Sequence, residues 1–320
     1  MKRVFFFVGK GGVGKTALST SLAYYLSRQK RSVYFASIDP AHNICDIIGC
    51  PPFLGEREIE HGLFVEEVDV ESYLRRFLRK IIEEIKSTYS YLKIINLDRM
   101  FEVIKNAPGM EESAIMHGLN DIIDRHRDMD YIIIDTPPTG LMLKIFNLPF
   151  ITGTWLEGLR DLRYRILDRR AAISAIKGKE YFAKNVAIDK KKDKVLKEIM
   201  AQKALVDSLI KTFKEKSIFI LVVNPDRLSL MEGIRIKNAL SNINIHIKLI
   251  LMNKSGLLPL SLDIKEFSHI PIKKIPFLEN LSKEKIYQLA DDWAKDILTH
   301  PQRHVNYFME GWPSGLRRRS

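Results

Sequence analysis

The sequence is poor in cysteine. Its 320 residues include only two, Cys45 and Cys50, which lie five positions apart rather than in a C-x-x-C pair. Two cysteines at this spacing indicate neither a disulfide framework nor a zinc site. We therefore expect a protein of a reducing compartment, the cytoplasm.

Long hydrophobic runs are missing as well. No stretch approaches the roughly 20 consecutive apolar residues that cross a bilayer. The basic residues 1–3 and the apolar residues 4–8 are similar to the start of a signal peptide, but the apolar run is too short and leads into a glycine-rich loop. The hydrophobic content of 46% is enough for a sizeable core.

Acidic residues are too few to balance the basic ones. Lys and Arg number 51 against 39 Asp and Glu, which gives a net charge of +12. This excess makes nucleic acid, an anionic membrane surface or an acidic protein candidate partners. A basic surface that faces only solvent is an equally valid interpretation, so composition leaves the partner open.

One segment, Gly9-Lys10-Gly11-Gly12-Val13-Gly14-Lys15-Thr16, is highly specific. It has the G-x-x-x-x-G-K-[ST] spacing of a phosphate-binding loop, in which glycines let consecutive backbone N–H groups point at an anion. Lys15 is expected to reach the β- and γ-phosphates, and Thr16 to place its hydroxyl on Mg2+. The sequence therefore predicts a nucleotide site here.

Both flanks of this loop have the required character. Residues 4–8 have the composition of a strand, and residues 17–28 form a helix pattern whose positive end would point at the phosphates. The predicted nucleotide-binding residues of the loop are Gly9, Gly11, Gly12, Val13, Gly14, Lys15, Thr16 and Ala17.

Two further strand patterns end in aspartate. Residues 32–38 lead to Asp39, and residues 130–134 lead to Asp135. Ligands of α/β sheets bind at the carboxyl ends of the strands, and a buried parallel strand can deliver a carboxylate there. Capping of a following helix is the alternative role for such an aspartate. Beside a phosphate loop, the predicted magnesium residues are Thr16, Asp39 and Asp135.

Lys10 is unnecessary for binding phosphate within one subunit. It resembles the signature lysine of the deviant P-loop ATPases, which include the arsenite-pump ATPases, the Get-pathway targeting ATPase for tail-anchored proteins, the partition and division-site ATPases, and the nitrogenase iron protein. In that group the lysine reaches across a dimer interface to the partner's nucleotide. The resemblance implies a homodimer that sandwiches ATP, with Lys10 and Lys15 in the catalytic set.

Two loops resemble one branch of the group. Residues 39–43, Asp-Pro-Ala-His-Asn, and 135–140, Asp-Thr-Pro-Pro-Thr-Gly, look like switch I and switch II of the arsenite-pump and Get-targeting ATPases. Residues 107–112 and 228–235 also resemble family segments, and the similarity extends to about residue 276.

The resemblance assigns further roles. It implies that Asp39 orients or deprotonates the attacking water and that Asn43 helps to place that water. It implies that Asn253 and Pro276 frame the adenine, with the Asn253 amide at its edge, and that Gly140 lets switch II respond to the γ-phosphate. The expected cofactors are ATP and Mg2+.

Apolar residues recur at helical spacing over residues 73–85 and 155–216, within the two regions, about 70–127 and 155–216, that are expected to contribute a helical subdomain. By the resemblance these regions form a helical subdomain whose groove shields a client's membrane helix. The alternative is a helical cap that packs on itself. The second region also carries the run Lys190-Lys191-Lys192 and several arginines, which are candidates for contact with lipid head groups or an acidic partner, and more weakly with nucleic acid.

The chain departs from the family at several places. Leu141 stands where switch II commonly has His, and the paired cysteines that bridge the Get-targeting dimer through zinc have no counterpart, so no zinc is expected. Cys45 and Cys50 lie beside switch I and do not match the arsenite-binding cysteines. Residues 284–298 predict a closing amphipathic helix, and 311–320 are expected to be a mobile tail outside the fold.

We therefore predict a doubly wound α/β domain of the P-loop NTPase (SIMIBI) type over residues 1–310, with a mainly parallel sheet and an inserted helical subdomain. Its predicted strands are 4–8, 32–38, 130–134, 218–223 and 246–252. The predicted function is an ATP-driven dimeric switch that captures and releases a protein client. A tail-anchored membrane protein is one possible client. The alternative is a positioning ATPase that acts on DNA or a membrane surface.

Overall fold

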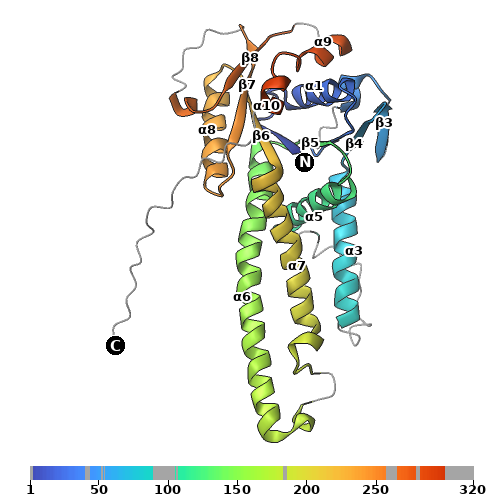
Figure 1. Ribbon diagram of the computed structural model, residues 1–320, viewed down its shortest axis with the longest axis vertical. Helices are drawn as coiled ribbons and strands as arrows, with labels where there is room; N and C mark the ends of the chain where they lie inside the picture. Colours follow the sequence, from blue (N-terminus) through green and yellow to red (C-terminus); the bar gives the residue numbers. More distant parts are fainter. Residues whose placement is uncertain are drawn as a thin grey trace.

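The computed structural model describes residues 3–39, 44–51, 53, 55–88, 105, 107–182, 186–256, 265–278 and 282–299. They build an α/β fold around one eight-stranded sheet with the strand order β3-β4-β2-β5-β1-β6-β7-β8 (Figure 1). Neighbouring strands are parallel except β3 and β4, which pair antiparallel. The predicted fold class is confirmed.

All five predicted strands are present. The strands are β1 (Arg3–Val8), β2 (Val33–Ser37), β3 (Glu56–Glu60), β4 (Leu63–Glu67), β5 (Tyr131–Asp135), β6 (Ser217–Val223), β7 (Ile247–Ser255) and β8 (Ile272–Pro276). Sequence analysis did not predict β3, β4 and β8. The two edge strands, β3 and β8, carry charged residues that protect an exposed edge and hide the strand pattern.

Helices cover both faces of the sheet, which explains why its central strands are almost entirely apolar. In β1, Phe5 and Phe7 join the core on one face, while Phe6 joins the core on the other. The first face is covered by α1 (Lys15–Arg28), α2 (Ile44–Ile48), α9 (Lys283–Gln288) and α10 (Ala294–Thr299). The second is covered by α5 (Met110–Arg125), α8 (Arg227–Ser241) and the start of α6 (Thr139–Lys177).

The single closing helix predicted over 284–298 is wrong, because the chain forms α9 and α10 with turns between them. Tyr287 of α9 stacks on Tyr24 of α1, with ring centroids 3.6 Å apart. Trp293, which is fully buried, lies edge-on to Phe7 at 6.3 Å. The turns let the chain follow the surface from one contact to the other.

A long helical hairpin projects from the sheet (Figure 1). Helix α6 has 39 residues, about 58 Å at 1.5 Å per residue, and α7 (Lys194–Lys211) returns beside it. A π-helical turn over Thr212–Lys216 joins α7 to β6, and α3 (Val70–Thr88) packs on α5. The helical pattern predicted from residue 155 therefore belongs to a helix that already starts at Thr139.

The distal end of the hairpin is held by polar contacts. Arg163 donates two hydrogen bonds to the buried carboxylate of Asp193, at 3.0 and 2.6 Å. Asp193 also caps α7 by accepting from the Leu196 N–H at 2.6 Å, and Arg163 lowers the pKa of this carboxyl. Arg170 donates to the Ala187 carbonyl at 3.2 Å. These bonds fix the two helices relative to each other.

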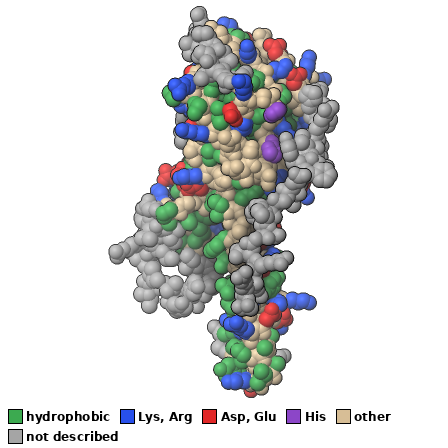
Figure 2. Space-filling model, turned by 90° about the vertical axis from the view of Figure 1, so that its left-hand side faces the viewer, with side chains coloured by type: hydrophobic (Ala, Val, Ile, Leu, Met, Phe, Trp, Pro, Cys, Tyr) green, Lys and Arg blue, Asp and Glu red, His purple; other side chains and the backbone are tan. Residues whose placement is uncertain are grey.

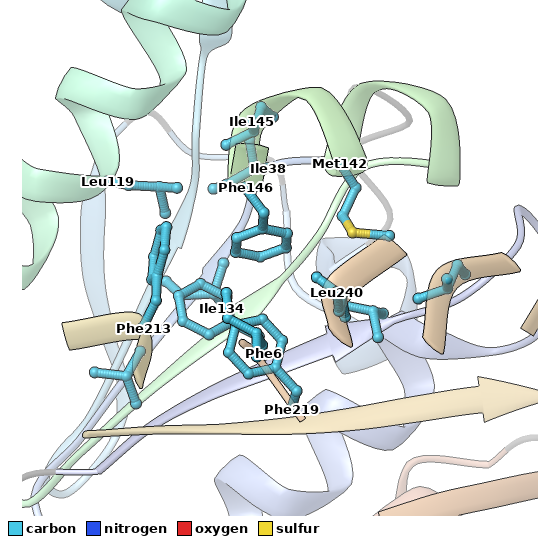
Figure 3. Close-up of a cluster of buried hydrophobic side chains, with 14 of the residues drawn as sticks. Phe6, Ile38, Leu119, Ile134, Met142, Ile145, Phe146, Phe213, Phe219 and Leu240 are labelled. Carbon is cyan, nitrogen blue, oxygen red and sulfur yellow. The ribbon is translucent and has the colours of Figure 1, made fainter. Parts of the chain in front are cut away.

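An aromatic cluster joins the root of the hairpin to the sheet (Figure 3). Phe146 of α6 lies 5.2 Å from Phe6 of β1, 5.1 Å from Phe213 of the π-helical turn and 5.1 Å from Phe219 of β6. Most of these contacts are edge-to-face, the geometry that aromatic pairs prefer. At its root, the hairpin is thus anchored through Phe146 and Phe213 on Phe6 of β1, the strand that precedes the phosphate loop.

Candidate functional site

The predicted phosphate loop lies between β1 and α1, at the carboxyl end of the central strand. Lys15 is 4% exposed, and its Nζ donates to the carbonyl of Lys10 at 3.4 Å, inside the loop. The Lys10 side chain is exposed. Helix α1 begins at Lys15, so its free N–H groups and positive dipole end face the loop.

At two positions of the loop, only glycine fits without a steric clash. Gly14 caps α1 with φ 96°, and a Cβ there would collide with the side-chain amide of Asn253. A Cβ on Gly9 would collide with the carbonyl of Val222 in β6. Gly11 and Gly12 have open space where a Cβ would stand, so the loop backbone remains accessible.

Asp135 lies at the end of β5, and its carboxylate is completely buried. Its Oδ2 accepts from the Thr16 hydroxyl at 2.7 Å and from the Ser37 hydroxyl at 3.1 Å. Among the described residues, Oδ1 has no hydrogen-bond partner. Burial raises the pKa of Asp135 to about 6, against the opposing effects of Lys15 and the two hydroxyls. The structure thus places Thr16 and Asp135 together, as the predicted magnesium site requires.

Asp39 follows β2, and its backbone N–H donates to the Ser37 hydroxyl at 3.3 Å. It lines the same pocket as Lys15 and Thr16. Ser37 therefore connects the two aspartate loops, which the sequence analysis did not foresee, because a serine at the end of a strand carries no specific signal. Asn43 lies outside the described residues.

The pocket beside the loop has a volume of about 420 Å3. Its lining includes Asn253 and Pro276, the two residues predicted to frame a base, and residues that were not predicted complete it. They are Leu18, Asp46, Ile47, Lys254, Phe277, Leu278 and Leu289.

The amide of Asn253 is largely committed to the protein backbone. Its Nδ2 donates to the Val13 carbonyl at 2.8 Å, and its Oδ1 accepts from the Lys254 N–H at 2.9 Å. One amide N–H is left for a base acceptor. Lys254 has a left-handed φ of 57°, and its Nζ donates to the Gly12 carbonyl at 3.4 Å. Asn253 and Lys254 together tie β7 to the phosphate loop.

These residues fit a magnesium nucleotide. The open glycine backbone, the α1 N-terminus and Lys15 suit a polyphosphate, and the apolar residues of the pocket lining suit a base. The buried Oδ1 of Asp135 beside the Thr16 hydroxyl suits a hard cation held directly or through water.

A first prediction concerns Asp135→Asn. Because Asp135 titrates at about 6 in the fold and near 4 when unfolded, the folded state binds a proton more tightly, and this group's contribution falls as pH rises between those values. At pH 7 the metal-free protein holds a buried charge that Asn removes. We expect Asp135→Asn to stabilise it by about 1 to 3 kcal/mol at pH 7, and by much less at pH 4.5.

The measurement is thermal unfolding without magnesium at both pH values. The same variant should lose most of the stabilisation that magnesium and ATP give to the wild type. Equal melting temperatures for variant and wild type at pH 7 would contradict the buried-charge account.

A second prediction concerns Lys254→Ala. The substitution removes the contact with the Gly12 carbonyl and the aliphatic stem at the base end of the pocket. We expect ATP binding to weaken by about five- to tenfold, the effect of roughly 1 kcal/mol. Titration with a fluorescent ATP analogue measures it. Lys248→Ala, at an exposed position near the other end of β7, is the control and should bind like the wild type.

Comparisons with known proteins agree with this geometry. The family model described as "Anion-transporting ATPase" (ArsA_ATPase) matches residues 2–280. A putative arsenical pump-driving ATPase 2 of Aquifex aeolicus is 29% identical over 79% of this chain and 80% of its own length. ATPase ASNA1 homolog 2 of Paramecium tetraurelia is 29% identical over 77% of this chain and 74% of its own. A Cryptosporidium parvum ASNA1 homolog is 28% identical over 77% and 63%.

Proposed function

This chain belongs to the anion-transporting ATPase family, and we propose that it is an ATP-hydrolysing homodimeric switch that captures and releases a client protein with an apolar helix. A tail-anchored membrane protein is the client class that fits this proposal. One observation carries it. Helix α6 starts at Thr139, directly after the short loop that follows Asp135, and carries an exposed apolar stripe farther along.

The chemistry needs little beyond positioning and charge neutralisation. Lys15 and the start of α1 would hold the β- and γ-phosphates, and Asp39 would orient the attacking water. Magnesium, held by Thr16 and Asp135 with Asp39 nearby, would neutralise charge on the transferred phosphoryl group. Lys10 would extend to the nucleotide of a partner subunit.

The link from nucleotide to hairpin is short. Ile38, next to Asp39, donates its N–H to the Asp135 carbonyl at 2.9 Å, so the two switch segments are joined at their roots. Thr136 donates its hydroxyl to the Phe7 carbonyl at 2.6 Å, next to the phosphate loop. Pro138 then caps α6, so a displacement of residues 136–138 on loss of the γ-phosphate would be passed to the whole helix.

The apolar stripe consists of Ile151, Trp155 and Leu162, which are 65%, 64% and 52% exposed. Their spacing of four and seven residues places them on one face of α6. The buried residues Gly153 and Leu156 lie on a different face, and the added Cβ of Gly153 would contact Val206 of α7. The stripe is therefore free of α7, and Figure 2 shows hydrophobic side chains along the hairpin.

The names of the relatives suggest a second candidate, the driving of an arsenical pump. A soft metalloid favours thiolate ligands, and the sequence contains only Cys45 and Cys50. Burial, and to a lesser extent a hydrogen bond with Cys50, raises the pKa of the Cys45 thiol to about 12, which disfavours the thiolate. Client capture is therefore the proposal we favour over pump driving.

The test is the light-scattering mass of the purified chain with ATP and magnesium, with and without a peptide that contains one hydrophobic membrane helix. We expect the peptide to co-elute with a dimer or a larger oligomer. Trp155→Ser combined with Leu162→Ser should abolish co-elution while nucleotide binding persists. The matched control, Ile173→Ser with Ile176→Ser, also replaces two exposed apolar residues, farther along α6, and should retain the peptide. A nucleotide-bound oligomer that ignores the peptide would refute client capture.

A further inference from the structure

Most of the excess positive charge of this protein is concentrated in a tenth of the chain. Residues 165–197, which we call the hairpin tip, contain eleven Lys and Arg but four Asp and Glu, a net charge of +7 out of +12 for the whole protein. The tip comprises the end of α6, the start of α7 and the short helical turns between them. It lies at the end of the molecule opposite the sheet (Figure 1).

Three of the four acidic residues of the tip have partners within the hairpin, two of them cationic side chains and one a backbone N–H. Lys190 lies 2.7 Å from Asp168, and Arg163 holds Asp193 at 2.6 Å. Asp189 accepts from the Lys191 N–H at 2.9 Å and so caps a turn. The exposed basic side chains of the tip include Arg165, Arg169, Lys177, Lys191, Lys192, Lys194 and Lys197, and they are available to a partner.

The same tip exposes large apolar side chains. Ile176 is 84% exposed, Tyr181 58%, Val195 47% and Ile173 38%. Lys177 lies over the ring of Tyr181, with its Nζ 4.7 Å from the centroid. Figure 2 shows hydrophobic and basic side chains next to each other at this narrow end of the molecule.

We infer that the hairpin tip docks on the surface of an anionic lipid bilayer. A headgroup layer over hydrocarbon suits both halves of this surface, because lysines and arginines bind the headgroups while aliphatic and aromatic residues enter the interface. A nucleic acid backbone would satisfy the cations but would leave Ile173 and Ile176 in water. Of the described helices, none has the length and apolar content to cross a membrane, so contact at the surface is the form that fits.

The contacts that hold the tip together suit this role. The Arg163 to Asp193 pair and the Arg170 to Ala187 bond fix the end of α6 against the start of α7, so the surface needs little ordering on binding. The nucleotide pocket lies at the sheet end of the molecule, whereas the tip lies at the other end of α6, a helix about 58 Å long. Docking of the tip would therefore leave that pocket open. Membrane docking also does not depend on whether the apolar stripe captures a client.

The experiment is co-sedimentation of the full chain with vesicles of phosphatidylcholine alone, or with about 30% phosphatidylserine, at low and high salt. We expect binding to the anionic vesicles only, and loss of that binding at high salt. Lys191→Gln, Lys192→Gln and Lys194→Gln together should lower the partition coefficient about 100-fold, roughly fivefold for each lysine. Ile173→Ser with Ile176→Ser should lower it at least tenfold.

Matched controls separate the tip from overall charge. Lys216→Gln, Lys248→Gln and Lys274→Gln remove the same charge at exposed positions outside the tip, and this variant should bind within about twofold of wild type. The stripe variant Trp155→Ser, Leu162→Ser should bind vesicles normally although it loses the client peptide. Circular dichroism melting verifies that each variant is folded.

Three results would overturn the inference. Equal losses in the two lysine variants would mean that overall charge, not the tip, attracts the bilayer. Normal binding by the Ile173→Ser, Ile176→Ser variant would mean that no apolar residue enters the interface. Binding to a DNA duplex but to neither vesicle type would identify a nucleic-acid surface instead. Each result leaves the client-peptide test unaffected, so failure here and failure of the proposed function are distinguishable.

Discussion

Asp39→Asn should reduce the turnover of ATP by about 100- to 10,000-fold while it leaves ATP binding nearly unchanged. The carboxylate lines the pocket with Lys15 and Thr16, and its backbone is fixed by the Ser37 hydroxyl that also bonds Asp135. Asparagine keeps the size of the side chain but loses the negative charge that would orient a water for attack. Single-turnover hydrolysis and an ATP-analogue titration measure the two effects separately.

Lys15→Ala is the comparison variant for that experiment. Its buried ammonium group lies inside the loop, so its loss should weaken nucleotide binding itself. The two variants should therefore fail in different ways, Asp39→Asn in kcat and Lys15→Ala in the dissociation constant. An Asp39→Asn protein with normal turnover would remove Asp39 from the catalytic set and leave the pocket as a binding site only.

The phosphate loop and the two aspartates could be located from the sequence because their signals are local. Glycine spacing, a strand before the loop and a helix after it are all contained in the first 28 residues. Asp39 and Asp135 each end an apolar run, and parallel strands bring such ends to one edge of a sheet. The sheet order confirms the arrangement, since β1 lies beside β5, and β5 beside β2.

Long-range contacts could not be predicted in this way. Asn253 meets the Val13 carbonyl across 240 positions of sequence, and Lys254 meets Gly12 across 242. Nothing near residue 254 predicts its left-handed backbone. Ser37 was missed for a similar reason, because its role depends on two partners from other segments.

Helical periodicity predicted which residues share a face, but not what covers that face. The pattern in the hairpin includes Val206 and Leu209, which are buried, and Ile173 and Ile176, which are exposed. All four are apolar and helical, and only the position of α7 against α6 distinguishes them. For the same reason, periodicity predicted a single helix over residues 284–298. The chain instead forms two helices, and Tyr287 contacts Tyr24 while Trp293 contacts Phe7.

Lys10→Ala should leave ATP binding by the monomer intact but abolish the nucleotide-dependent dimer and lower turnover by at least 1,000-fold. The expectation rests on the exposed position of the Lys10 side chain, while its own carbonyl accepts from Lys15. Within one subunit Lys15 already occupies the loop, so a second ammonium group has a role only across an interface. A cation supplied in trans to a phosphoryl transition state is worth about 10³ to 10⁵ in rate.

Sedimentation velocity with a non-hydrolysable ATP analogue and magnesium measures the dimer, and a coupled assay measures turnover. Lys10→Arg is the control, because it keeps the charge and should recover part of both, with the geometry of the longer planar group limiting the recovery. A mixture of Lys10→Ala with Asp39→Asn subunits sharpens the test. If Lys10 acts in trans, a mixed dimer has one pocket with an intact Asp39 that receives Lys10 from the partner, so mixing should restore turnover, to at most about a quarter of the wild-type value. No restoration, together with a normal dimer, would show that Lys10 serves its own subunit.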